Sequence, residues 1–261
     1  MSRHVRYLTT DSVRRARMRA AAAILAALIA AAACHRAPRL TAITHGGGGP
    51  PTLVLLHGYG ASADQWLPFT QTIRLPPAGR FVFPHAPESM SRTDGTTTGR
   101  AWWPLGLAAQ IPPGASLPDL SATRPPGLSV AAALVQDLLD DLERSPGRPI
   151  LLGGYSQGAM VASELAFRRD APIDALILLS GTLVDEASWE SGFARRRGVP
   201  VFMSHGRADP VLPFAIADRF RVKLQAAGVR VTWVPFEGGH EVPGVVVGRL
   251  NEFLSEIRFT R

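Results

Sequence analysis

The chain has 261 residues, of which 46% are hydrophobic and 19% charged, and this composition favours a large folded domain over a disordered chain. Its formal net charge of +7 does not indicate a nucleic-acid-binding surface, because residues 1–33 hold six arginines and one aspartate and the remainder holds 22 basic and 20 acidic residues. Cys34 is the only cysteine, which excludes a disulfide within the chain and a multi-cysteine metal cluster.

The N-terminus has the pattern of an export signal, with clustered arginines before the apolar run "AAAILAALIAAAAC" that ends at Cys34. This ending resembles the lipobox of bacterial lipoproteins, in which the cysteine is lipidated and becomes the new N-terminus. We expect residues 1–33 to be cleaved off, with translation starting at Met1 or Met18. An uncleaved membrane anchor is the alternative, but the run is short of the ~20 residues that a span needs. The expected location is the bacterial cell envelope, and a secreted or periplasmic soluble protein is the other possibility.

Residues 34–51 are expected to hold a linker and the region of a first strand, and a catalytic domain is expected over residues 52–261. Continuous apolar runs predict strands buried on both faces at residues 52–57, 80–85, 149–155, 175–181, 199–206 and 229–236. Helical spacing of apolar residues predicts helices at residues 62–73, 128–144, 157–168, 214–227 and 245–257, the first with a Ser62/Gln65 capping box. This alternation predicts a three-layer α/β sandwich with a mostly parallel central sheet.

Two segments interrupt the alternation of strands and helices. Residues 87–127 are rich in Pro, Gly, Ser and Thr and include "GRAWWPLG", and residues 182–198 form a second interruption. The first is too long and irregular for an ordinary connection. We expect it to be a functional excursion over one edge of the sheet.

The pentapeptide GYSQG at residues 154–158 fits the pattern G-x-S-x-G, with Ser156 at its centre. It lies between a predicted strand and a predicted helix, where such a serine is held on a strained turn and flanking glycines let the neighbouring backbone come close. A chance match is not rare in a glycine-rich chain, but the strand–turn–helix context makes the pattern specific. Ser156 is therefore a candidate nucleophile.

A serine nucleophile requires a base and an acid, which follow it in the order Ser, Asp or Glu, His in this type of domain. Asp209 and His240 come directly after two later strands, so both are expected at the carboxyl edge of the sheet. Taken alone, Asp209 before a proline reads as a turn former, and His240 in its glycine-rich loop is equally well explained as a surface histidine or as a base. The order of the three residues favours a triad, with Asp185 and Glu237 as the alternative acids.

The other histidines near strand ends have a different expected role. His57 and His205 each end an apolar strand in a His-Gly dipeptide, and we expect structural histidines that bond nearby backbone. His85 precedes the first excursion and is a candidate for the pocket wall. None of them has the chain position that the base requires.

The negative oxygen that forms during ester hydrolysis needs two backbone N–H donors. The N–H of Gln157, directly after the nucleophile at a helix N-terminus, is the first candidate. The second is the N–H of Tyr59, in the glycine-rich loop "LLHGYGAS" after an earlier strand. The Tyr59 ring is free to act as a packing aromatic, because the donor is its backbone.

The segments "LVLLHGYGAS", "FVFPHAPE" with "AWW", "GGYSQGAM", "SHGRADPVLP" and "EGGHEVP", in this order, resemble the phospholipase/carboxylesterase group of α/β-hydrolases. This group includes acyl-protein thioesterases and bacterial carboxylesterases, and the match runs from about residue 52 to the C-terminus. The resemblance implies an α/β-hydrolase fold and hydrolysis of esters or thioesters without a cofactor or metal. The site residues that it implies are Ser156, Asp209 and His240 as triad and Tyr59 and Gln157 as oxyanion donors.

We therefore expect an exported serine carboxylesterase that acts on small-molecule acyl esters, with no nucleic-acid partner and no membrane contact beyond a lipid anchor at Cys34. A lysophospholipase or thioesterase using the same triad is the alternative, and a non-catalytic binding protein on the same fold is a third possibility. Trp102 and Trp103 are predicted either to wall the acyl pocket or to anchor the excursion to the core. Acyl chain length, leaving group and oligomeric state do not follow from the sequence.

Overall fold

The computed structural model describes residues 39–91, 95–105, 117–143 and 149–257. The chain divides into two compact units, Met1–Arg39 and Leu40–Arg261, and nearly all described residues belong to the second. The predicted signal and Cys34 lie outside the described residues. Within the described ranges, no helix combines the length and the apolar character needed to cross a bilayer.

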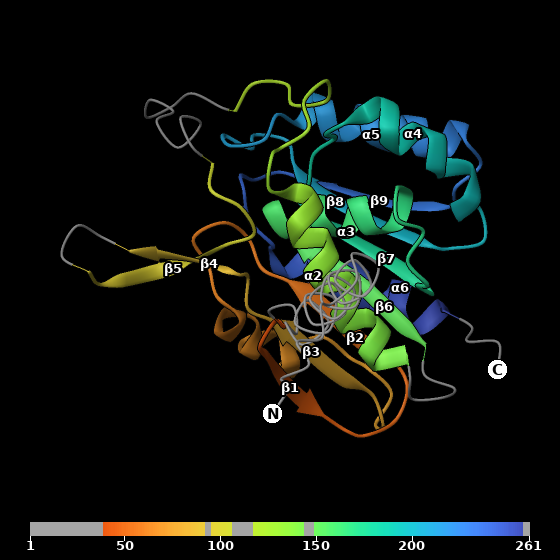
Figure 1. The fold of residues 1–261 in the computed structure, drawn as a ribbon. Helices are drawn as coiled ribbons and strands as arrows, with labels where there is room; N and C mark the ends of the chain where they lie inside the picture. Colours follow the sequence, from red (N-terminus) through yellow and green to blue (C-terminus); the bar gives the residue numbers. More distant parts are fainter. Residues whose placement is uncertain (1–38, 92–94, 106–116, 144–148, 258–261) are drawn as a thin grey trace, which may run out of the picture. The chain divides into compact units, whose positions relative to one another are not determined.

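The second unit is built on a seven-stranded sheet with the order β1-β3-β2-β6-β7-β8-β9 (Figure 1). β1 pairs antiparallel with β3, and the other neighbours pair in parallel. The strands are β1 (Ala42–Gly46), β2 (Thr52–Leu56), β3 (Arg80–Pro84), β6 (Ile150–Tyr155), β7 (Ala175–Leu179), β8 (Val201–Gly206) and β9 (Val231–Phe236). Each strand predicted from an apolar run is present, so the mostly parallel α/β sheet is confirmed.

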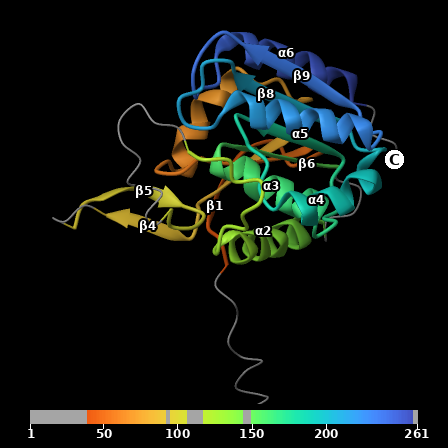
Figure 2. The ribbon, with the colours of Figure 1, turned by 90° about the horizontal axis from the view of Figure 1, so that it is seen from above.

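Helices cover both faces of the sheet, because alternate side chains of its buried strands point to opposite sides. In β2, Val54 and Leu56 pack into one core, whereas Leu53 and Leu55 pack into the other. The first core is closed by α2 (Leu128–Glu143), α3 (Gln157–Phe167), α4 (Glu186–Phe193) with the short 3-10 turn η3 (Ala194–Arg196), and α5 (Phe214–Ala226). The second core is closed by the 3-10 helix η1 (Ala63–Gln71) and by α6 (Gly244–Glu256), which lies on the opposite side of the sheet in Figure 2.

Helix α3 is buried along its whole length, with all eleven of its residues in the interior. The carboxylate of Glu164 on this helix is fully buried, and it accepts hydrogen bonds from Arg124 at 2.7 Å and from the indole N–H of Trp189 at 2.8 Å. A buried carboxylate is tolerated only when its oxygens are paired in this way. These bonds tie α3 to α4 and to the segment before α2.

The C-terminal end of α3 is capped by two consecutive arginines. Arg195 donates to the carbonyl oxygen of Phe167 at 3.0 Å, and Arg196 donates to that of Ala166 at 2.6 Å. The last carbonyls of a helix have no partner within the helix and carry its partial negative charge. The two guanidinium groups satisfy these carbonyls and stabilise that end of α3.

The first predicted helix differs from expectation in two ways. It is a 3-10 helix, and Ser62 makes no capping bond, because its hydroxyl donates to Asp64 at 3.1 Å instead. Pro68 lies inside η1 and has no N–H to donate to a carbonyl of the preceding turn. The predicted capping box with Gln65 was therefore wrong, and the proline explains why regular α-helical bonding is not available.

The two interruptions contain structure that the sequence did not predict. The first begins with a hairpin, β4 (Glu88–Ser91) and β5 (Thr97–Ala101), which extends away from the central sheet (Figures 1 and 2). Its base is fixed to the loop after β2, because the Gly60 N–H donates to Arg100 O at 2.9 Å and the Arg100 N–H donates to Ala61 O at 2.8 Å. The second interruption contains α4.

Candidate active site

Ser156 occupies a sharp turn between β6 and α3, where its backbone has φ 54° and ψ −117°. A positive φ is strained for a residue with a side chain, so the surrounding packing must hold it. A Cβ at Gly154 would lie 2.3 Å from the backbone of Gly158, and one at Gly158 would lie 2.3 Å from the carbonyl oxygen of Leu56. Both flanking positions of the G-x-S-x-G pattern therefore require glycine for close approach.

The three candidate triad residues lie together at the carboxyl edge of the sheet, after β6, β8 and β9. The distance from His240 Nε2 to Ser156 Oγ is 2.9 Å, and that from His240 Nδ1 to Asp209 Oδ2 is 2.7 Å. An ionised carboxylate only accepts, so Nδ1 carries the hydrogen and the lone pair of Nε2 faces the serine hydroxyl. The alternative acids lie elsewhere, since Asp185 pairs with Arg124 and the side chain of Glu237, 87% exposed, pairs with Arg207.

Asp209 is held by donors on both of its carboxylate oxygens. Oδ1 accepts the N–H groups of Val211 at 2.8 Å and Leu212 at 2.9 Å, while Oδ2 lies 3.2 Å from His205 Nε2 in addition to its bond with His240. Burial alone would raise the pKa of Asp209, but the hydrogen bonds from His205, His240 and Leu212 outweigh it and hold the pKa well below its usual range. The carboxylate is therefore ionised and fixed in orientation.

Tyr155 holds the loop that carries His240. Its hydroxyl donates to the backbone carbonyl of His240 at 2.7 Å, and the two rings lie 5.1 Å apart between centroids. Burial raises the pKa of Tyr155 to about 12, with a further contribution from Asp209 and Glu241. The hydroxyl thus remains a donor at neutral pH. No pattern in the sequence indicated this role, because Tyr155 occupies a variable position of the G-x-S-x-G motif.

The two candidate oxyanion donors come from the residue after Ser156 and from the loop after β2. Gln157 is the first residue of α3, and Tyr59 lies in the loop after β2, next to Gly58, where a Cβ would come within 3.4 Å of Ser156 Cβ. In the described turns, loops and helix caps, neither of these two N–H groups donates to a backbone carbonyl. Tyr59 and Gln157 therefore remain the predicted oxyanion donors.

His57 fastens the loop that carries Tyr59, as expected for a structural histidine. Its Nδ1–H donates to the carbonyl of Gly58 at 2.8 Å, and Nε2 accepts the N–H of Ala86 at 3.1 Å. The backbone carbonyl of His57 in turn accepts the indole N–H of Trp102 at 2.8 Å. Burial lowers the pKa of His57 to about 4, although the bond to Gly58 opposes this, so the imidazole is neutral at physiological pH.

Trp102 and Trp103 lie in the core, only 1% and 4% exposed, and do not line the cavity beside Tyr155. The side-chain amide of Gln157 joins their backbones, since its Oε1 accepts the Trp102 N–H and its Nε2 donates to the Trp103 carbonyl, both at 2.9 Å. That they wall the acyl pocket stays a prediction, and neither residue lines this cavity. Their burial fits the anchoring alternative, because a large aromatic ring contributes more to the stability of the fold in a core than on a loop surface.

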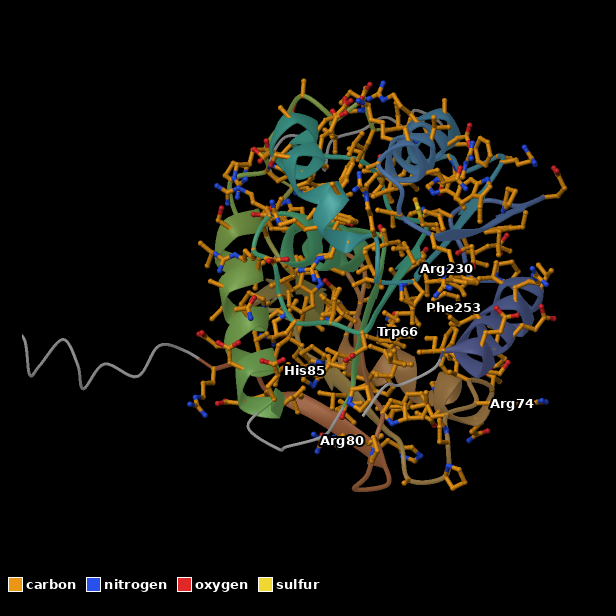
Figure 3. All side chains as sticks on the ribbon, turned by 90° about the vertical axis from the view of Figure 1, so that its right-hand side faces the viewer. Trp66, Arg74, Arg80, His85, Arg230 and Phe253 are labelled. Atoms are coloured by element: carbon orange, nitrogen blue, oxygen red, sulfur yellow. The ribbon has the colours of Figure 1, made fainter. Side chains whose placement is uncertain are left out.

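A cavity of about 200 Å³ lies beside Gly58 and Tyr155, the latter being the residue before Ser156, on the side of the sheet covered by η1. Its wall is mostly apolar and consists of His57, Gly58, Ala61, Gln65, Trp66, Phe69, Tyr155 and Val242. Figure 3 shows Trp66 in the interior of the domain, whereas Arg74 lies at its periphery. The residues of η1 thus shape this cavity, and none of its lining residues comes from the described part of the excursion.

The domain has a mostly parallel sheet with helices on both faces, and a serine on a strand-to-helix turn lies beside a histidine and an aspartate. These features define an α/β-hydrolase. The chain belongs to the phospholipase/carboxylesterase family, whose model matches residues 45–258. It is an ester hydrolase of the serine type found in this family.

Individual relatives agree with this assignment. The chain is 28% identical to acyl-protein thioesterase 1 of Kluyveromyces lactis over 166 residues, 62% of this chain and 70% of that protein. It is 24% identical to acyl-protein thioesterase 1 of Neurospora crassa, over 77% of this chain and 81% of that protein. The crystal structure of esterase PE8 superposes with a TM-score of 0.70 and 28% identity, covering 85% of this chain and all of that one. The Bacillus cereus carboxylesterase, at 18% identity and a TM-score of 0.63, supports the fold alone.

Proposed function

We propose that the protein is a carboxylesterase in which Ser156, His240 and Asp209 form the catalytic triad. The observation that carries this proposal is the double hydrogen bond of His240, to Ser156 Oγ at 2.9 Å and to Asp209 Oδ2 at 2.7 Å. This geometry activates a serine hydroxyl, because the base accepts its proton while the carboxylate stabilises the imidazolium that forms.

The reaction then proceeds in two steps through an acyl-enzyme. Ser156 Oγ attacks the ester carbonyl as its proton moves to His240 Nε2, and the N–H groups of Tyr59 and Gln157 donate to the oxygen that becomes negative. The imidazolium of His240 gives its proton to the leaving alcohol. Water, deprotonated by His240, next attacks the acyl-enzyme and releases the acid and free Ser156.

The cavity supports a small apolar group as the part of the substrate next to the ester. Its volume of about 200 Å³ is somewhat larger than the ~150 Å³ cavity that encloses a benzene molecule. We expect short acyl or phenyl-sized groups to be accepted with little rearrangement, and kcat/KM to fall as the acyl chain outgrows the cavity. A series of p-nitrophenyl esters of increasing chain length measures this directly.

A thioester is the second candidate substrate, favoured by the sequence similarity to acyl-protein thioesterases. The same triad serves both reactions, because only the leaving atom differs. Parallel assays with p-nitrophenyl esters, acyl thioesters of the same chain length and lysophospholipids distinguish the classes through their kcat/KM values.

The catalytic role of Ser156 is tested with the Ser156→Ala variant. Removing a triad member should lower kcat by roughly 10⁴-fold or more and leave the fold intact. A fluorophosphonate probe should label the wild-type protein at Ser156 and leave the variant unlabelled. Near-normal hydrolysis by the folded variant would reject the mechanism, and a folded wild-type protein that takes up no probe would favour a non-catalytic binding protein.

We also propose that the enzyme is exported and anchored by lipid on Cys34, supported by the basic and apolar sequence before this residue. One acyl chain anchors only marginally, at about 0.8 kcal/mol per buried CH₂, whereas several chains hold firmly. Cys34→Ser should move the protein out of the membrane fraction, and a chain beginning at His35 should remain active in solution. Wild-type protein that fractionates as unlipidated would instead favour an ordinary secretory signal.

A further inference from the structure

His205 is the last residue but one of β8 and lies four positions before Asp209, with its side chain fully buried. Its Nε2 atom lies 2.9 Å from the carbonyl oxygen of Leu212 and 3.2 Å from Oδ2 of Asp209. From the sequence, His205 was expected to be a structural histidine that bonds nearby backbone. The contact with Asp209 is a second bond, and it reaches the acid of the proposed triad.

The direction of these bonds follows from the chemistry of the partners. A carbonyl oxygen can only accept, so Nε2 of His205 carries the hydrogen and donates it to Leu212, and Oδ2 of Asp209 lies 3.2 Å from the same nitrogen. Nδ1 of the same ring is buried and has no hydrogen-bond partner among the described residues. His205 therefore presents a single donor, which bonds to Leu212 O and also lies 3.2 Å from the carboxylate of Asp209.

The N–H of His205 is one of the groups that hold the Asp209 carboxylate in its orientation. The N–H groups of Val211 and Leu212 fix Oδ1 and leave Oδ2 to be placed by its own partners. Oδ2 has two of them, His240 and His205, and only His205 belongs to the strand that precedes the acid. The strand end thus sets where Oδ2 lies, and with it the position and tautomer of the His240 ring.

We propose that His205 is a positioning residue for ester hydrolysis, which holds Oδ2 of Asp209 in line with His240 Nδ1. This inference rests on the triad proposed above. Misplacing a catalytic group by about 1 Å can cost about 100-fold in rate. We therefore expect loss of the His205 donor to lower kcat about 10- to 100-fold while KM changes less than twofold, because His205 is not among the residues that line the cavity.

The first experiment compares His205→Met, which removes the donor at similar volume, with His205→Gln, whose amide nitrogen can occupy a position close to Nε2. Met should lower kcat and Gln should restore most of it, with thermal melts to show that both fold. If the Met variant does not fold, His205→Asn replaces it, since the shorter amide does not reach Asp209. Equal activity of the Gln and donor-free variants would overturn the proposal.

The second experiment repeats the donor-free substitution in an Asp209→Ala background. A residue that acts through Asp209 has nothing left to position there, so the double variant should match Asp209→Ala in kcat. A further 10-fold loss in that background would overturn the proposal and indicate a structural role through Leu212. If Asp209→Ala alone leaves kcat unchanged, the triad assignment fails instead, so the two ideas fail in different ways.

Discussion

Two buried histidines stand at the ends of parallel strands of the same sheet in the same dipeptide, His57-Gly58 directly after β2 and His205-Gly206 as the last two residues of β8. On the oxyanion side of the site, residues 57–61, both ring nitrogens of His57 bond to backbone groups. On the acid side, residues 205–212, one ring nitrogen of His205 bonds to backbone and to Asp209, and the other has no partner among the described residues. The oxyanion side must place backbone N–H groups, so its histidine fastens backbone. The acid side must place a carboxylate, so its histidine also reaches a side chain.

The largest effect is expected on the acid side, from Asp209→Asn. The amide would donate toward His240 Nδ1 and favour the tautomer in which Nε2 holds a hydrogen and cannot accept the serine proton, so kcat should fall about 10⁴-fold. Initial rates with a p-nitrophenyl ester measure this, and a thermal melt serves as the control for folding. A loss of less than tenfold would remove Asp209 from the triad.

The oxyanion side and the acid side should also affect the free energy of unfolding in different pH ranges. Burial lowers the pKa of His57 from 6.5 to about 4, so the unfolded chain binds a proton in this range and the folded chain does not. Stability should therefore fall by about 3 kcal/mol between pH 6.5 and pH 4, at 1.36 kcal/mol per pKa unit. The pKa of Asp209 is lowered from 3.8, so the ionised carboxylate stabilises the folded state at higher pH. This contribution to stability is lost only as the pH falls below about 3.8.

Urea unfolding at a series of pH values tests this separation with His57→Asn as the matched variant. The variant lacks the titrating ring, so its stability should depend less on pH between 6.5 and 4 than that of the wild type. If the free energy of unfolding fell by the same amount in both proteins between pH 6.5 and pH 4, the loss of stability in that range would not be due to His57.

A smaller effect is expected from Trp102→Phe on the oxyanion side. The substitution leaves the buried carbonyl of His57 without its donor, which costs about 2 kcal/mol in the free energy of unfolding. Trp103→Phe is the control, because it trims an equally buried indole without removing that bond. We expect the Trp102 variant to be the less stable of the two in urea unfolding, and the opposite order would contradict the role of the indole N–H.

The smallest effect is expected from Glu237→Gln, at the exposed pair with Arg207. Exposed ion pairs contribute little, so stability should change by less than about 0.5 kcal/mol and kcat by less than about twofold. This variant also tests the alternative acid, since a 100-fold loss of kcat would transfer that role from Asp209 to Glu237.

The sequence could predict the sheet and the candidate triad because both follow from local signals. Buried parallel strands read as continuous apolar runs, and residues that follow such strands meet at one edge, so Ser156, Asp209 and His240 could be proposed before the geometry was known. The preference for Asp209 over Asp185 followed the position of Asp209 directly after a strand, and the structure places Asp185 with Arg124.

Contacts between separate loops could not be predicted in the same way. The bond from Tyr155 to the carbonyl of His240 joins residues 85 positions apart, and no local pattern encodes it. Trp102 looked like a pocket residue because large aromatic side chains on an irregular segment suggest a ligand, whereas its burial depends on the core that it meets. Pro68 was a visible argument against a regular α-helix in η1, since proline has no N–H to donate, but it does not by itself specify a 3-10 helix.

The complete burial of α3 limits both the local opening of this helix and the substitutions that it can tolerate. A helix with no face in water, a paired internal carboxylate and two arginines on its last carbonyls opens only when the surrounding core opens. Its amides should exchange with deuterium among the last in the protein, which places the serine that it carries on the least mobile element of the fold. The 3-10 helix η1, which forms part of the cavity wall, is stabilised on one face only. Variants with altered substrate range should therefore arise by substitution in η1, whereas α3 should tolerate very few changes.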